Sequence, residues 1–109
     1  MNKEEFFKLI KDMSSDLYKV DGYTVTRNFS KHANCITFTY KSQEYKEIPL
    51  FKVSGYPKIY INYYVKPETP NICINSNFFV RQEIMDIKHR IGNYLELLGF
   101  TVKMGYIGW

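Results

Sequence analysis

No stretch of this 109-residue sequence approaches the roughly 20 consecutive apolar residues that a membrane-spanning helix requires. The apolar cluster at residues 6–10 is interrupted by Lys8 and is too short for the hydrophobic region of a signal peptide. Cysteine is also scarce, with only Cys35 and Cys73, and nothing else indicates an oxidising compartment. We therefore expect a cytoplasmic protein that does not contact a membrane and keeps both thiols reduced and buried.

The short motifs that carry catalysis or nucleotide binding are missing as well. The sequence contains no glycine-rich dinucleotide motif, no phosphate-binding loop and no HExxH zinc motif. Neither cysteine has the flanking glycines or the nearby base of a nucleophile. Glu44 and Glu47 would fall on opposite faces of a strand, and Asp86 with Arg90 has the spacing of a surface ion pair. We predict that the protein is not an enzyme and uses no cofactor.

The sequence offers one set of residues that could coordinate a metal ion. His32 and Cys35 have the spacing of a ligand pair, and Cys73 with His89 could complete a set of four. However, Cys73 and His89 are sixteen residues apart and fall on an expected strand and an expected helix. His89 also lies off the apolar side of that helix. We therefore predict no metal, and stoichiometric zinc in protein purified without chelator would contradict this.

Alanine is nearly absent, whereas aromatic residues make up 17% of the chain and ten of them are tyrosine. This bias toward Tyr, Ile, Asn and Lys could reflect an AT-rich coding sequence as well as function. The net charge of +4 is unevenly distributed: residues 22–66 sum to +5, residues 1–21 to −1 and residues 67–109 to zero. The positive charge is therefore expected in the strand-rich middle of the chain.

Two amphipathic helices are expected. Asn2 and Glu5 have the spacing of a capping box, and an apolar series follows over about four turns. The apolar series consists of Phe6, Leu9, Ile10, Met13 and Leu17. The second helix would start at an N-cap among residues 75–77 and end at Gly99 and Phe100 in a Schellman motif. Its apolar stripe consists of Val80, Ile84, Ile87, Ile91, Tyr94, Leu95 and Leu98. Gly92 interrupts this helix, and we expect a close approach of its backbone to the sheet.

Between the helices, period-two alternation of apolar and polar residues predicts antiparallel strands. The expected strands are residues 23–28, 34–40, 44–50, 58–66 and 72–74, with another at 101–104. The predicted fold is a single α+β domain over residues 1–109. It is a two-layer sandwich, with an antiparallel sheet of four to six strands, two helices packed on one face and the order α-β-β-β-β-(β)-α-β. Residues 105–109 form a tail without a structural prediction.

Residues 58–66 give the clearest strand signal and the candidate binding site. Ile59, Ile61, Tyr63 and Val65 alternate on the face predicted to be buried. The opposite face carries Tyr60 and Tyr64 and is bracketed by Lys58 and Lys66. Tyrosines are enriched at binding hot spots, and lysines favour an acidic partner. We therefore predict a small binding protein that recognises a protein partner through Lys58, Tyr60, Tyr64 and Lys66.

Several alternatives stay open at this stage. Lysines beside aromatic rings also suit single-stranded nucleic acid, although a net charge of +4 is small for that function. A small enzyme with an unrecognised site is a second alternative. The tyrosines could also be ordinary strand residues, or be covered by the C-terminal tail or by a second subunit in a homodimer. Size and composition alone resemble those of small inhibitors or accessory proteins from phages and mobile elements.

Overall fold

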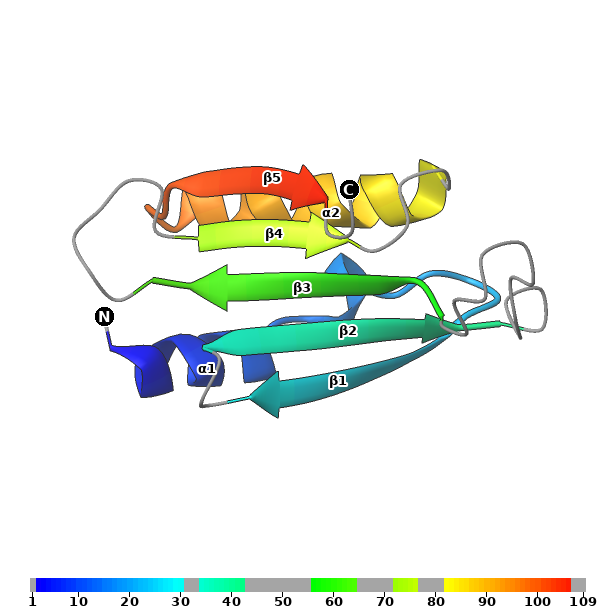
Figure 1. Ribbon diagram of the computed structural model, residues 1–109, viewed down its shortest axis with the longest axis horizontal. Coiled ribbons are helices and arrows are strands. Elements are labelled where there is room, and N and C mark those ends of the chain that lie inside the picture. The colour runs from blue at the N-terminus through cyan, green and yellow to red at the C-terminus, as the bar shows by residue number, and fades with distance from the viewer. Residues whose placement is uncertain (1, 31–33, 43–55, 65–71, 77–81, 107–109) are drawn as a thin grey trace.

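The computed structural model describes residues 2–30, 34–42, 56–64, 72–76 and 82–106. The elements in chain order are α1 (Lys3–Lys11), the short 3-10 helix η1 (Ser15–Leu17), β1 (Thr24–Ser30), β2 (Cys35–Lys41), β3 (Lys58–Tyr63), β4 (Ile72–Ser76), α2 (Gln82–Leu97) and β5 (Val102–Tyr106). The five strands form one sheet in the order β1-β2-β3-β4-β5 (Figure 1). The predicted α+β class with two α-helices is therefore confirmed, and the sheet is mostly antiparallel. The strand expected at 44–50 lies outside the described residues.

The direction of β5 differs from the prediction of an antiparallel sheet. Strands β1 to β4 pair antiparallel with their neighbours, whereas β5 pairs parallel with β4, with Ile72 opposite Val102. The reason is the connection through α2, because the chain passes along this helix before entering β5 in the direction of β4. Strand β5 also begins and ends later than expected, at Val102 and Tyr106.

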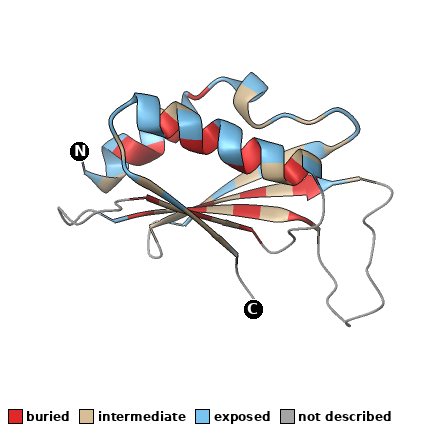
Figure 2. Ribbon diagram, turned by 90° about the horizontal axis from the view of Figure 1, so that it is seen from above, coloured by how far each residue is buried: buried red, intermediate tan, exposed pale blue. Residues whose placement is uncertain are grey.

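The core lies between the sheet and the helices. Figure 2 shows both helices on the same side of the sheet, with buried residues on the facing surfaces. Alternation along β3 follows the prediction, since Ile59, Ile61 and Tyr63 are buried and the residues between them are half-buried. Val65 lies outside the described ranges. The ring of Phe6 from α1 stacks on Tyr63 at the end of β3, with 4.4 Å between centroids, and joins the helix to the sheet.

Helix α1 begins as predicted but ends early. The side chain of Asn2 accepts a hydrogen bond from the Glu5 amide at 2.8 Å, and Glu5 Oε1 accepts one from the Asn2 amide at 3.5 Å, completing the capping box. The helix ends at Lys11 instead of continuing for four turns. Ser14 then caps η1 by accepting a hydrogen bond from the Asp16 amide. Serine competes for backbone hydrogen bonds, which explains the break.

Helix α2 ends as predicted. The Gly99 amide donates to Glu96 O at 3.0 Å and the Phe100 amide donates to Leu95 O at 3.1 Å, which is the Schellman pattern. Gly99 has a φ of +100°, where glycine is favoured. Leu98, by contrast, is 48% exposed and does not belong to the buried stripe. The predicted N-cap is also wrong for residues 75 and 76, because both lie in β4.

Gly92 brings α2 close to the sheet, as the sequence predicts. A Cβ built on this residue would overlap Met104 Cε of β5 and would contact Val102 and Ile74. The helix therefore rests on β4 and β5 at the point where it has no side chain.

We expect Gly92→Leu to lower the free energy of unfolding by about 1–3 kcal/mol, because its side chain must displace packed residues of β4 and β5. Gly92→Ala is the matched control, since the flexible end of Met104 can move and alanine adds about 1 kcal/mol of helix propensity. Urea unfolding of both variants measures the difference. Equal stabilities for the two variants would contradict close packing at Gly92.

Candidate functional site

The side chains that alternate with the core residues form one continuous surface, which we call the outer face. It consists of Thr24, Thr26, Asn28 and Ser30 of β1, Cys35, Thr37, Thr39 and Lys41 of β2, Lys58, Tyr60 and Asn62 of β3, Cys73 and Asn75 of β4, and Lys103 and Gly105 of β5. Neither described helix covers this face (Figure 2). Most of its members are short, uncharged and able to hydrogen-bond.

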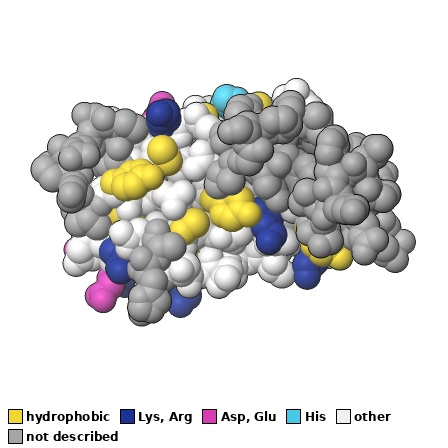
Figure 3. Space-filling model, in the orientation of Figure 1, with side chains coloured by type: hydrophobic (Ala, Val, Ile, Leu, Met, Phe, Trp, Pro, Cys, Tyr) yellow, Lys and Arg dark blue, Asp and Glu magenta, His cyan; other side chains and the backbone are white. Residues whose placement is uncertain are grey.

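Charge is divided between the two sides of the described structure. The outer face contains three lysines and no aspartate or glutamate. All carboxylates of the described ranges belong to α1, to α2 or to the segment between α1 and β1. In Figure 3, which views the outer face, hydrophobic side chains lie among uncharged polar ones and acidic groups appear only at the margins. The outer face therefore has a positive electrostatic bias.

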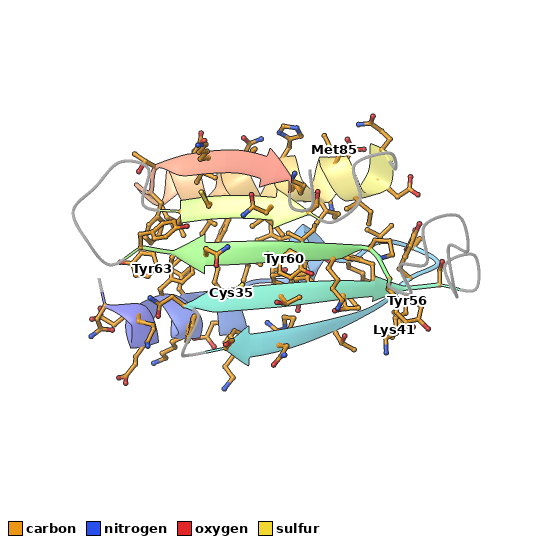
Figure 4. All side chains as sticks on the ribbon, viewed as in Figure 1. Cys35, Lys41, Tyr56, Tyr60, Tyr63 and Met85 are labelled. Carbon is orange, nitrogen blue, oxygen red and sulfur yellow. The ribbon has the colours of Figure 1, made fainter. Side chains whose placement is uncertain are left out.

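Tyr60 lies near the centre of the outer face. It is opposite Thr37 on β2 and Asn75 on β4, and it is half-buried. Figure 4 shows Tyr60 on β3 and Cys35 on the neighbouring strand β2, where Cys35 is opposite Asn62. Burial raises the pKa of the Tyr60 hydroxyl, and the neighbouring Cys35 raises it further. The hydroxyl is therefore neutral at physiological pH and can both donate and accept a hydrogen bond.

Tyr64 follows the end of β3 and is the more accessible of the two tyrosines, with 49% of its surface exposed. Burial of the remainder and the thiol of Cys73 raise its pKa. Since Cys73 belongs to the outer face, this contact places the Tyr64 hydroxyl on the same side as Tyr60. Lys58 is half-buried on that side, opposite Thr39. Three of the four predicted residues thus lie on the same side of the sheet, spread along β3 and the residue that follows it, and Lys66 lies outside the described ranges.

The cysteines differ from the prediction of buried thiols. Both are free, half-buried and part of the outer face. Cys35 and Cys73 lie opposite the same residue, Asn62, from the two strands beside β3. Two strand spacings separate them by about 10 Å, beyond the roughly 7 Å between Cα atoms that a disulfide allows. His32 is not described, and the described residues contain no group of three or more potential metal ligands.

One end of the outer face carries a contact that the sequence did not indicate. The Lys41 ammonium lies 5.2 Å from the centroid of the Tyr56 ring. Such a cation–π contact holds the lysine at the margin of the sheet. Lys58 points to the same face one strand away, so positive charge gathers at this end.

A buried lysine is the other feature that sequence analysis missed. Lys88 of α2 is 1% exposed, and its Nζ donates to Ser76 Oγ at 3.2 Å and to Gly105 O at 2.7 Å. Ser76 is 0% exposed, so this amine–hydroxyl pair joins α2 to the ends of β4 and β5 inside the protein. The sequence indicates this position, because Lys88 lies four residues from both Ile84 and Gly92. Residues four apart lie on the same side of a helix, so Lys88 faces the sheet with them.

An open groove of about 530 Å³ lies on the helical side. It is lined by Asp16, Lys19, Val20, Asp21, Glu83, Asp86, Ile87 and Arg90. Several of its polar groups bond within the protein: the Tyr23 hydroxyl donates to Glu83, Gln82 donates to Asp86 and Arg90 donates to Asp16 O. The predicted ion pair between Asp86 and Arg90 is therefore wrong. The mixed charges of this groove define no ligand.

Comparison of the chain with protein-family models, curated proteins and solved structures gives no match. Within the described ranges, neither helix is long and apolar enough to cross a membrane. The geometry of the outer face is therefore the basis for a functional proposal.

Lys88 predicts a specific pH dependence of stability. Burial lowers its pKa below the ordinary 10.5, so the unfolded chain binds more protons between the lowered pKa and 10.5. The contribution of Lys88 to stability therefore rises with pH through this window. Urea unfolding from pH 7 to 10 should show wild type gaining stability relative to Lys88→Met.

Other titrating groups contribute equally to the pH dependence of wild type and of Lys88→Met, so their contributions cancel in the difference between the two. Burial raises the pKa of Tyr40, for example, and this tyrosine is present in both. A stability difference that stays constant from pH 7 to 10 would show that Lys88 does not titrate in this window.

Proposed function

We propose that this chain is a small non-enzymatic binding protein that recognises a protein partner through its outer face. The contact would centre on Lys58, Tyr60, Tyr64 and Lys66. The observation that carries this proposal is the outer face itself, which has tyrosine and lysine side chains, no carboxylate and no described helix over it.

The chemistry of the outer face favours an acidic protein surface as partner. Tyr60 and Tyr64 supply ring area together with hydroxyl groups, the combination that dominates binding hot spots. The surrounding threonine, serine and asparagine side chains can hydrogen-bond without the cost of desolvating a charge. Lys41, Lys58 and Lys103 on the outer face would steer an acidic partner toward it.

Single-stranded nucleic acid is the alternative supported by the same lysines and rings. Tyr60 of β3 and Tyr64, which follows the end of that strand, are four residues apart in an extended segment, or roughly 13 Å, so they cannot stack on adjacent bases. The many uncharged side chains also provide no neutralisation of phosphates. These two features favour protein as the partner. We further propose that the protein acts in the cytoplasm, as an inhibitor or accessory protein of a phage or mobile element.

Replacing both tyrosines in Tyr60→Ala/Tyr64→Ala should reduce partner capture from a lysate of the native host by tenfold or more, about 1.4 kcal/mol or more of binding free energy. Because both rings lie outside the core, the melting temperature should stay within about 2 °C of wild type. Quantitative mass spectrometry of captured proteins measures the first effect and calorimetry the second.

The matched control is Leu97→Ala/Leu98→Ala, which removes two exposed apolar side chains from the helical side. This variant should capture the partner as wild type does. A large fall in melting temperature for the tyrosine variant would show that the rings serve the fold. Equal losses of capture in both variants would rule out the outer face as the contact.

Binding to labelled single-stranded DNA and RNA provides the test between protein and nucleic acid. We expect no saturable binding at 50 mM salt and unchanged protein capture after nuclease treatment of the lysate. Binding that weakens steeply with salt, as release of counterions from phosphates requires, would instead support the nucleic-acid alternative.

A further inference from the structure

The first strand has an open hydrogen-bonding edge whose residues can be assigned. Tyr40 N donates to Pro57 O at 2.9 Å, and Tyr63 N donates to Asn34 O at 3.0 Å. In an antiparallel pair, alternate residues of a strand bond to the same neighbour. Residues 34, 36, 38 and 40 therefore bond toward β3, and residues 35, 37 and 39 bond toward β1.

The register between β1 and β2 extends this alternation of hydrogen-bonding direction to β1. Thr26 is opposite Thr39 and Asn28 is opposite Thr37, so these two residues bond to β2. The N–H and C=O groups of Val25, Arg27 and Phe29 consequently point away from β2. No hydrogen bond joins them to another described residue, and Figure 1 shows β1 as the last strand at this side of the sheet. Within the described ranges, these three residues form a ladder of backbone groups that has no partner strand.

The ladder on β1 lacks three of the usual protections of edge strands, which are a bulge, a proline and a lysine. Its seven residues pair with β2 without a bulge, and they include no proline and no lysine. The opposite edge is different, because β5 is five residues long and carries Lys103. A long and regular edge of this kind is a template on which an extended segment adds as another strand.

Arg27 is the one charged residue of this edge, and its side chain lies on the helical side. Its Nη1 donates to Ile10 O at 3.3 Å and to Lys11 O at 3.1 Å, at the C-terminal end of α1. The guanidinium also lies 5.2 Å from the centroid of the Tyr18 ring. A guanidinium has five N–H donors, and these two bonds leave donors on its other nitrogens. No carboxylate of the described ranges pairs with it.

The charge of Arg27 selects between possible occupants of the edge. If the β1 edges of two copies of this chain paired antiparallel, all three residues of the ladder would bond only when Arg27 of one copy lies opposite Arg27 of the other. The reason is that Arg27 is the middle residue of the ladder. Like charges directly opposite each other destabilise a strand pair. A carboxylate opposite Arg27 would instead meet the N–H donors of its guanidinium, because this half-buried side chain lies on the helical side of the sheet.

We propose that the β1 edge binds an extended segment of another protein, which adds as an antiparallel strand and places a carboxylate opposite Arg27. The backbone groups of Val25, Arg27 and Phe29 supply the hydrogen bonds, and the guanidinium supplies the sequence preference. This inference does not depend on the function of Tyr60 and Tyr64, because it concerns a separate edge and is tested with a separate ligand.

The probe is a capped peptide as long as β1, in which Thr and Val alternate around a central Glu (Thr-Val-Thr-Glu-Thr-Val-Thr). Its Glu and Val side chains would lie on the side of Arg27, and its Thr side chains would extend the outer face. Titration into the ¹⁵N-labelled full chain should give saturable shifts and slower hydrogen exchange at the amides of Val25, Arg27 and Phe29. The same peptide with a central Lys should bind about tenfold more weakly, because it brings a like charge to Arg27.

Two variants test the two parts of the proposal. Arg27→Gln should remove the preference for Glu over Lys. Val25→Pro removes one outward N–H without removing a bond to β2, and should abolish binding. If Val25→Pro does not fold, the peptide comparison on wild type and Arg27→Gln still decides the outcome. No saturable shifts at β1 with the Glu peptide, or equal binding of both peptides, would overturn the proposal, and so would a wild-type homodimer by sedimentation with these amides protected from exchange.

Discussion

The structure depends on the fact that the described helices cover only one face of the sheet. Each strand must therefore divide its side chains, with one set in the core and the other on the outer face. Burial of a single isoleucine such as Ile61 contributes about 1.5–3 kcal/mol, and a shift of one residue in register would exchange it for Tyr60 or Asn62. The same division that fixes the register produces the outer face.

Helix α2 contacts the sheet in two contrasting ways. At Gly92 the absence of a side chain lets the backbone approach β4 and β5. At Lys88, one turn earlier, the amine reaches Ser76 and the backbone of Gly105, so a polar group connects the same three elements. A buried amine costs desolvation free energy, and these two acceptors offset part of that cost. Together the two residues fix where α2 crosses the sheet.

Local signals in the sequence predicted the features that neighbouring residues determine. The capping box of Asn2, the Schellman ending at Gly99 and the alternation along β3 depend on residues a few positions apart. The parallel direction of β5 and the acceptors of the Lys88 amine could not be read in this way, because both follow from the packing of α2 against distant strands. For the candidate site, alternation placed Tyr60 and Tyr64 correctly, but the contact of Tyr64 with Cys73 requires the register of β3 and β4.

The outer face and the β1 edge meet along one strand. Thr24, Thr26, Asn28 and Ser30 project onto the outer face, and they alternate along β1 with the three residues of the edge. A segment added to β1 would therefore widen the outer face by one strand, in line with β2 and β3. Both surfaces also favour negative charge, through Arg27 on one side of the added strand and the lysines of the outer face on the other. One acidic partner with an extended segment could thus use the two surfaces together, and its linked contacts would strengthen each other through a high effective concentration.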